Sequence, residues 1–162
     1  MNNLIMRWRY SQQLIVSWVA IAFMIWLATT TGVQAANLPA AIMYRDPNCT
    51  CCGGWMKHMQ SQGFQVKNVP TADMISLKQQ YGVTDDLASC HTAIIDGYVV
   101  EGHVPSDDIK RLLAQKPDIK GIAVPGMPVG TPGMESGNIH DSYAVVSFDK
   151  QGQTKVFKQY SF

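Results

Sequence analysis

Three of the chain's four cysteines lie within four consecutive residues. Cys49, Cys51 and Cys52 follow the short apolar run 41–44, which is typical of a buried strand. After a Pro-Asn turn and the cysteines, residues 53–62 show the apolar and polar spacing of an amphipathic helix. A packed apolar core does not require three neighbouring sulfur atoms. The cluster therefore predicts a chemical site at a junction between a strand and a helix.

The position and spacing of these cysteines suggest two kinds of chemistry. A helix N-terminus has unpaired N–H groups and the positive end of the helix dipole, so it favours thiolate over thiol. Cys49 and Cys52 form a C-x-x-C pair, as in thiol redox sites, but Cys51 adds a sulfur that a dithiol couple does not need. Three close sulfurs suit a soft cation better. Structural disulfides in a small exported protein are the alternative.

The first 35 residues predict a secretory signal peptide. Arg7 and Arg9 precede the uncharged apolar run 14–28, and the small residues up to Ala35 provide a cleavage site. This run is shorter than the roughly 20 residues of a membrane span. An uncleaved anchor formed by residues 14–28 is the alternative. Both interpretations export residues 36–162, and we expect them in the periplasm.

The composition of the exported part excludes some partners and restricts the roles of the cysteines. Of the 162 residues, 46% are hydrophobic, enough for one domain with its own core. Without Arg7 and Arg9 there are 11 basic and 12 acidic residues and no basic run, which argues against nucleic acid and anionic membrane surfaces as partners. In an oxidising compartment, cysteines tend to be paired, catalytic or bound to metal. All four cysteines are in the exported part.

Together with the first strand and helix, the residues that follow predict an α/β domain with the element order βαβαββα. Residues 64–69 alternate as a strand, and a second helix runs from a cap at Thr71 to Tyr81. The Asp-Gly pair at 96–97, between two apolar runs, predicts a hairpin, and Ser106 caps a third helix.

A loop rich in glycine, proline and methionine follows the third helix. Residues 121–137 contain five glycines and three prolines together with Met127 and Met134. Such a long loop is typically functional, so we expect thioether ligation by these methionines or else simple packing. Residues 143–160 recover strand character around a turn and predict a closing β-hairpin.

This order of elements, with C-x-x-C between the first strand and the first helix, resembles a thioredoxin-like domain. In that fold, the segment before the third strand usually ends in a cis-proline and lies against the C-x-x-C. Cys90 and His91 occupy that place here, which argues against ordinary disulfide exchange and adds a sulfur and an imidazole to the cluster. The resemblance also places His103, at the end of the fourth strand, near the same edge. We expect His58 to face solvent and His140 to lie in a loop outside the site.

Four motifs in residues 40–135 form a specific combination. They are Cys49-x-Cys51-Cys52, Ser89-Cys90-His91-Thr92, Glu101-Gly102-His103-Val104-Pro105 and Ala123-Val124-Pro125-Gly126-Met127-Pro128. With them the chain resembles the CopG-like family of exported copper-resistance proteins, long classified as a domain of unknown function with predicted metal binding. The resemblance implies copper binding through cysteines in a thioredoxin-like domain. The implied ligands are Cys49, Cys51 and Cys52 with Cys90 close by, completed or covered by His91, His103, Met127 and Met134.

Ligand softness predicts the metal and, with it, the function. Thiolate and thioether groups favour Cu(I), whereas a zinc site would need well-separated pairs of ligands. We therefore expect a cysteine-bridged site for one or several copper ions, in a periplasmic protein that sequesters Cu(I) or passes it to periplasmic or inner-membrane efflux components. Cycling between Cu(I) and Cu(II) is left open, as is enzymatic activity.

Two alternatives remain from the sequence. One is a thiol–disulfide oxidoreductase that uses Cys49 and Cys52, with Cys51 or Cys90 resolving the mixed disulfide. The other is a disulfide-stapled binding module without metal.

Overall fold

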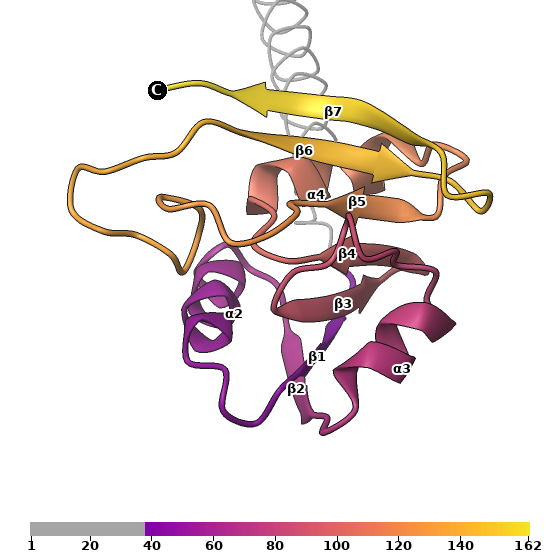
Figure 1. Cartoon of the computed structure of the whole chain (residues 1–162), viewed down its shortest axis with the longest axis horizontal. Coiled ribbons are helices and arrows are strands. Elements are labelled where there is room, and N and C mark those ends of the chain that lie inside the picture. The colour runs from indigo at the N-terminus through magenta and orange to yellow at the C-terminus, as the bar shows by residue number, and fades with distance from the viewer. Residues whose placement is uncertain (1–37) are drawn as a thin grey trace, which may run out of the picture. The chain divides into compact units, whose positions relative to one another are not determined.

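A seven-stranded mixed β-sheet runs through the part of the chain that the computed structural model describes, residues 38–162 (Figure 1). The strand order is β2-β1-β3-β4-β5-β6-β7. The predicted signal peptide lies outside the described residues, and within those residues no helix has the length and apolar character to cross a bilayer. In chain order the elements are β1 (Ala41–Arg45), α2 (Cys51–Ser61), β2 (Val66–Pro70), α3 (Met74–Gln80), β3 (His91–Ile95), β4 (Tyr98–Glu101), α4 (Ser106–Gln115), β5 (Gly121–Ala123), β6 (Tyr143–Phe148) and β7 (Thr154–Tyr160).

The predicted hairpin at the Asp-Gly pair is present. β3 and β4 pair antiparallel on either side of Asp96 and Gly97, with Ile95 opposite Tyr98. Asp96 has φ +49° and Gly97 has φ +83°, and two positive φ values are what a two-residue hairpin turn of type I′ requires. β3 also pairs antiparallel with β1, whereas β1 and β2 are parallel and are connected through α2. The segments that precede α2 and β3 therefore meet at one edge of the sheet.

The structure contains one strand that the sequence pattern did not predict. β5 lies at the start of the segment expected to be a loop, and it pairs parallel with β4 and antiparallel with β6. Three residues are too few to show a periodic pattern, so this strand depends on its neighbours. Gly121 permits the pairing, because a Cβ there would overlap the carbonyl oxygen of Val99. The predicted closing hairpin is present as β6 and β7.

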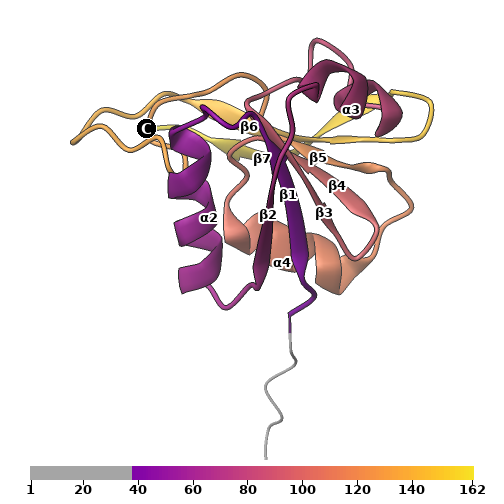
Figure 2. The same ribbon diagram turned by 90° about the horizontal axis from the view of Figure 1, so that it is seen from below.

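The helices cover both faces of the sheet, with α2 and α4 on one side and α3 on the other (Figure 2). Trp55 and Met59 from α2 and Ile109 and Leu112 from α4 are fully buried in the larger apolar core. A smaller core on the other side gathers Val83, Leu87, Val99, Ala123 and Phe148. Burial of this apolar surface stabilises the sheet that positions the cysteines.

The starts of α2 and α3 differ from the predictions, as does that of α4. α2 begins at Cys51, two residues earlier than expected, so its first turn contains two of the cysteines. α3 begins after Asp73 rather than after Thr71, because the Asp73 carboxylate accepts a hydrogen bond from the backbone N–H of Ser76 at 3.0 Å. Aspartate and threonine are both good caps, so a pattern of residue types does not distinguish them.

His58 does not face solvent as predicted. It is partly buried, and its Nε2 accepts a hydrogen bond from the backbone N–H of Ser106 at 3.3 Å. Ser106 is the first residue of α4 rather than its cap, and the cap position is held by Pro105, whose side chain makes no capping bond. The imidazole therefore supplies the acceptor that the start of α4 would otherwise lack.

Candidate metal centre

The four cysteines converge at the N-terminal end of α2. The sulfur of Cys51 lies 3.5 Å from the sulfur of Cys49 and 3.7 Å from that of Cys90. The sulfur of Cys52 lies 3.8 Å from the backbone oxygen of Cys90. All four sulfurs are within 4.8 Å of one another. Folding thus brings Cys90, far away in the chain, to the three clustered cysteines.

Two of these cysteines are joined and two are free. A disulfide links Cys49 to Cys52, and Cys51 and Cys90 are free thiols. Two-electron reduction of the bridge would give two further thiols beside the existing ones. The number of thiolates that this cluster can offer to a metal therefore depends on its redox state.

Cys90 also belongs to a second group of potential ligands. Its sulfur lies 2.9 Å from Nε2 of His103 and 3.4 Å from Nδ1 of His91. The sulfur and one nitrogen from each ring are within 4.8 Å of one another. Cys90 is therefore shared between a cluster of sulfurs and a pair of imidazoles.

The orientation of His103 is set by a backbone carbonyl. Its Nδ1 lies 2.7 Å from the carbonyl oxygen of Pro132, and because a carbonyl can only accept, Nδ1 carries the proton. The lone pair of Nε2 then faces Cys90. Burial lowers the pKa of His103, although the hydrogen bond to Pro132 acts in the opposite direction. The result is a neutral imidazole with an oriented donor atom, as in many metal sites.

His91 is completely buried, and one of its nitrogens is unsatisfied. Its Nε2 has no hydrogen-bond partner among the described residues. The ring packs against the indole of Trp55, with 4.5 Å between ring centroids. Burial lowers the pKa of His91 well below its usual value, and the neighbouring His103 adds to the effect. An unpaired polar atom in a protein interior is uncommon. Here the nitrogen without a partner is Nε2, whereas the nitrogen near the Cys90 sulfur is Nδ1.

Burial controls the ionisation of Cys90. Removal from solvent raises the pKa of its thiol to about 12, and the nearby Cys51 contributes in the same direction. At neutral pH the metal-free Cys90 is therefore a thiol that can donate to Nε2 of His103. The thiolate that a helix N-terminus favours is not found here, because Cys90 lies outside the helix and desolvation dominates.

The Gly/Pro/Met-rich loop lies directly on this region. Gly133 packs on Gly54 in α2, where an added Cβ would lie only 2.7 Å from the Gly133 Cα. At the start of the loop, the N–H of Gly126 donates to the carbonyl of Ala88 at 3.1 Å. The loop therefore contacts both the first turns of α2 and the segment that leads to Cys90.

The two loop methionines occupy different environments. Met127 is 54% exposed and follows Gly126, whose backbone N–H donates to Ala88. Met134 is partly buried, and its backbone is held by hydrogen bonds to Thr131 and Gly130. Both belong to the loop that packs on the site, but Met127 is much more exposed to solvent than Met134.

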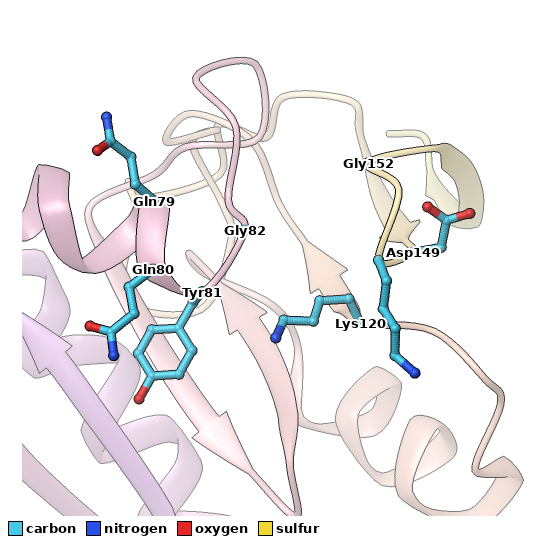
Figure 3. A pocket seen from close by; sticks show the side chains of 8 residues that line it. Gln79, Gln80, Tyr81, Gly82, Lys120, Asp149 and Gly152 are labelled. Carbon is cyan, nitrogen blue, oxygen red and sulfur yellow. The ribbon is translucent and has the colours of Figure 1, made fainter.

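A separate cleft of about 190 Å³ contains none of these groups. It lies between the end of α3 and the turn that joins β6 to β7, and Lys120 points across it toward Tyr81 (Figure 3). The sulfurs and imidazoles are elsewhere, so the candidate metal centre is defined by its donor atoms and not by this cleft.

Comparison with known proteins agrees with the geometry. The sequence model of a family described as a protein of unknown function, DUF411, matches residues 87–134. Two solved structures, both of the copper resistance protein CopG, are similar to the chain with a TM-score of 0.74 each. Form 2 is 47% identical over 76% of this chain and 99% of that one, and form 1 is 46% identical over 77% and 99%. No curated protein sequence matches the chain.

Fold and site together define a mixed α/β protein with a cysteine-rich candidate metal centre. The chain belongs to the CopG family of copper resistance proteins, so the resemblance seen in its motifs is confirmed. The family and the cysteine cluster both point to copper as the ion concerned.

Proposed function

We propose that the chain is a periplasmic protein that binds Cu(I) for copper resistance, either sequestering it or passing it to efflux components. The strongest support is the position of the Cys90 sulfur, 3.7 Å from Cys51 on one side and 2.9 Å from His103 on the other. A sulfur with such neighbours can bridge two ions, because thiolates have several lone pairs. The proposed ligands are Cys49, Cys51, Cys52, Cys90, His91 and His103, with Met127 and Met134 at the loop.

The donor set favours monovalent copper. Thiolates are soft ligands that select Cu(I), and neutral imidazoles also suit copper. With all four cysteines reduced, four sulfurs within 4.8 Å can bridge several ions in one compact cluster. Cys90 would connect this cluster to the imidazoles, so we propose a multinuclear site rather than a single ion.

We further propose that the domain is thioredoxin-like. The supporting observations are the order of the first seven elements and the arrangement β2-β1-β3-β4, with β1 and β2 parallel and β3 and β4 antiparallel. The C-x-x-C pair stands at the start of α2, and Cys90 precedes β3 directly. A thioredoxin-like fold has its redox pair at the start of the corresponding helix, so the position of Cys49 and Cys52 supports the proposal.

The disulfide supports redox cycling as part of the function. Two Cu(II) ions can each take one electron from the reduced Cys49 and Cys52 pair, giving two Cu(I) ions, one disulfide and two protons. The free thiols of Cys51 and Cys90 would then retain the Cu(I) product. A dithiol reductant would restore the pair by thiol–disulfide exchange.

The same disulfide favours a second candidate, a thiol–disulfide oxidoreductase. The free Cys51 sulfur lies 3.5 Å from that of Cys49, close enough to attack the bridge after modest movement. In this case metal would not be needed, and Cys51 or Cys90 would resolve the mixed disulfide.

Anaerobic copper loading of the reduced full chain distinguishes the two functions. We expect stoichiometric copper, with sulfur and nitrogen neighbours in X-ray absorption at the copper edge. Cys51→Ser and Cys90→Ser should each reduce the copper bound per chain, whereas His140→Ala, outside the site, should not. Insulin reductase activity without copper uptake would refute the copper function and support the oxidoreductase.

Export is tested separately. Cell fractionation should place the protein in the periplasm, and intact mass should show removal of residues 1–35. A cytoplasmic protein would contradict the proposal, and a membrane-bound protein of full mass would support the uncleaved anchor instead.

A further inference from the structure

A buried ion pair contacts the segment that contains Cys90 and His91. Glu101, the last residue of β4, is fully buried, and its carboxylate pairs with the ammonium group of Lys78 from α3, whose side chain is only 13% exposed. The carboxylate also accepts hydrogen bonds from the backbone N–H of Ser89 at 2.7 Å and from the hydroxyl of Thr92 at 2.6 Å. Ser89 and Thr92 lie on either side of Cys90 and His91. The carboxylate therefore holds both ends of the segment that contains these two proposed ligands.

Glu101 also precedes His103 by two residues in the chain. Between them, Gly102 has φ +73° and approaches the Ser89 side chain so closely that an added Cβ would lie 2.5 Å from its Cβ. The backbone N–H of Gly102 also donates to the carbonyl of His91 at 2.9 Å. Three hydrogen bonds thus join the end of β4 to the segment around Cys90. Glu101 accepts those from Ser89 and Thr92, and Gly102 donates the third to His91. A shift of Glu101 would change the distance between Cys90 and His103.

Burial of an ion pair is a poor way to stabilise a fold, because the desolvation of both charges offsets most of their attraction. Apolar residues that replace such a pair often stabilise a fold as well or better. Positional precision explains the pair better, since groups around metal ligands fix ligand geometry. We infer that Glu101 and Lys78 are positioning residues that hold Cys90 between Cys51 and His103. This inference rests on the proposed copper function but can be tested without metal.

The metal-free test measures how close Cys90 and Cys51 are held. In a full chain with Cys49→Ser and Cys52→Ser, the remaining thiols form a disulfide by reducing one oxidised glutathione to two reduced glutathione molecules. The equilibrium with a glutathione redox buffer gives their effective concentration. We expect Glu101→Gln to lower it by about tenfold, since small displacements have large effects on effective concentration. Asp96→Asn, which removes the exposed pair with Lys116 at the other end of the same hairpin, should leave it unchanged.

The second test measures Cu(I) affinity in a chain with all its cysteines, by anaerobic competition with a colorimetric chelator. Glu101→Gln should weaken binding by about 10- to 100-fold, as is typical when a group supporting a metal ligand is lost. Lys78→Arg keeps the charge and should bind like the wild type, whereas Lys78→Met should bind more weakly. If Glu101→Gln does not fold, Lys78→Met and Thr92→Val make the same comparison.

The outcomes separate this inference from the copper function. A folded Glu101→Gln chain with unchanged effective concentration and unchanged copper affinity would overturn it. A reduced effective concentration in a protein that binds no copper would support the positioning role and refute the copper function. An equal loss with Lys78→Arg and Lys78→Met would show that the charge is not what matters, which also overturns it.

Discussion

The Nε2 atom of His103 lies 2.9 Å from the sulfur of Cys90, and the opposite nitrogen of the same ring donates to the carbonyl of Pro132. The loop that carries Pro132 therefore fixes the face that His103 presents to the cysteine. Cys90 is in turn the only cysteine of the described residues placed in both groups of potential ligands. Loop, imidazole and thiol form one connected unit, and its parts can be tested separately.

Loss of the imidazole should weaken copper binding without unfolding the protein. We expect His103→Gln to lower Cu(I) affinity by at least tenfold, because it removes a neutral nitrogen donor that is already oriented. Anaerobic competition with a chelator measures this. His140→Gln is the matched control, since His140 stacks on Phe162 in the C-terminal part. Equal affinities in the two variants would show that His103 is not a ligand.

Copper binding should release the proton of Cys90. Burial raises the pKa of this thiol to about 12, so the metal must displace a proton throughout the neutral range. Each displaced proton makes the apparent copper affinity rise by about tenfold per pH unit. Titrations between pH 6 and 9 should show a smaller slope for Cys90→Ser than for the wild type. An identical slope would mean that this thiol keeps its proton or does not bind.

Two adjacent glycines in α2 should respond in opposite ways to alanine. Nothing lies within 4 Å of a Cβ added to Gly53, so Gly53→Ala should raise the free energy of unfolding by about 0.5–1 kcal/mol through helix propensity. A Cβ on Gly54 would press on the backbone of Gly133, so Gly54→Ala should destabilise by about 1–3 kcal/mol or displace the loop. Urea unfolding measures both. A stabilised Gly54→Ala would show that the loop does not pack as described.

Acid should weaken the contact between α2 and α4. Burial lowers the pKa of His58 in the folded protein, so the neutral ring that accepts from Ser106 is favoured there. The contribution of neutral His58 to the free energy of unfolding is complete above about pH 6.5, the pKa of histidine in the unfolded chain. It is lost as the pH falls from there through the lower pKa of His58 in the folded protein.

The effect should be no more than about half a kcal/mol, because solvent screens a partly exposed group. His58→Gln should flatten the dependence of unfolding free energy on pH below 6.5, whereas His140→Gln should not. The pKa values of the buried His91 and His103 are also lowered, so part of the acid sensitivity should persist in both variants. A His58→Gln profile that matches the wild type would refute the role of His58.

Local patterns were sufficient for most of the elements. The Asp-Gly hairpin, the helices with a clear apolar stripe and the closing hairpin follow from short-range rules of turn geometry and periodicity. β5 was missed because its three residues form a strand only through pairing with β4 and β6. His58 was assigned to the surface because its neighbours in the chain are polar, whereas its partner, Ser106, belongs to another helix.

The candidate site shows the same division. The motifs name every cysteine and histidine that the structure brings together, and they include the C-x-x-C pair that the disulfide joins. They contain no sign of the pair formed by Lys78 and Glu101. The signals for Glu101 are its place at the start of the motif of residues 101–105 and a carboxylate at the end of an otherwise apolar strand.

The sequence by itself determined the chemistry of this protein, because thiol and imidazole groups have the same ligand preferences wherever the chain places them. Only the tertiary structure decided how that chemistry is arranged. It placed Cys90 between Cys51 and His103. By burial it raised the pKa of Cys90 and lowered those of His91 and His103. It also buried the carboxylate of Glu101 against the segment that contains Cys90 and His91. Distances and burial arise from segments far apart in the chain, so no local pattern contains them.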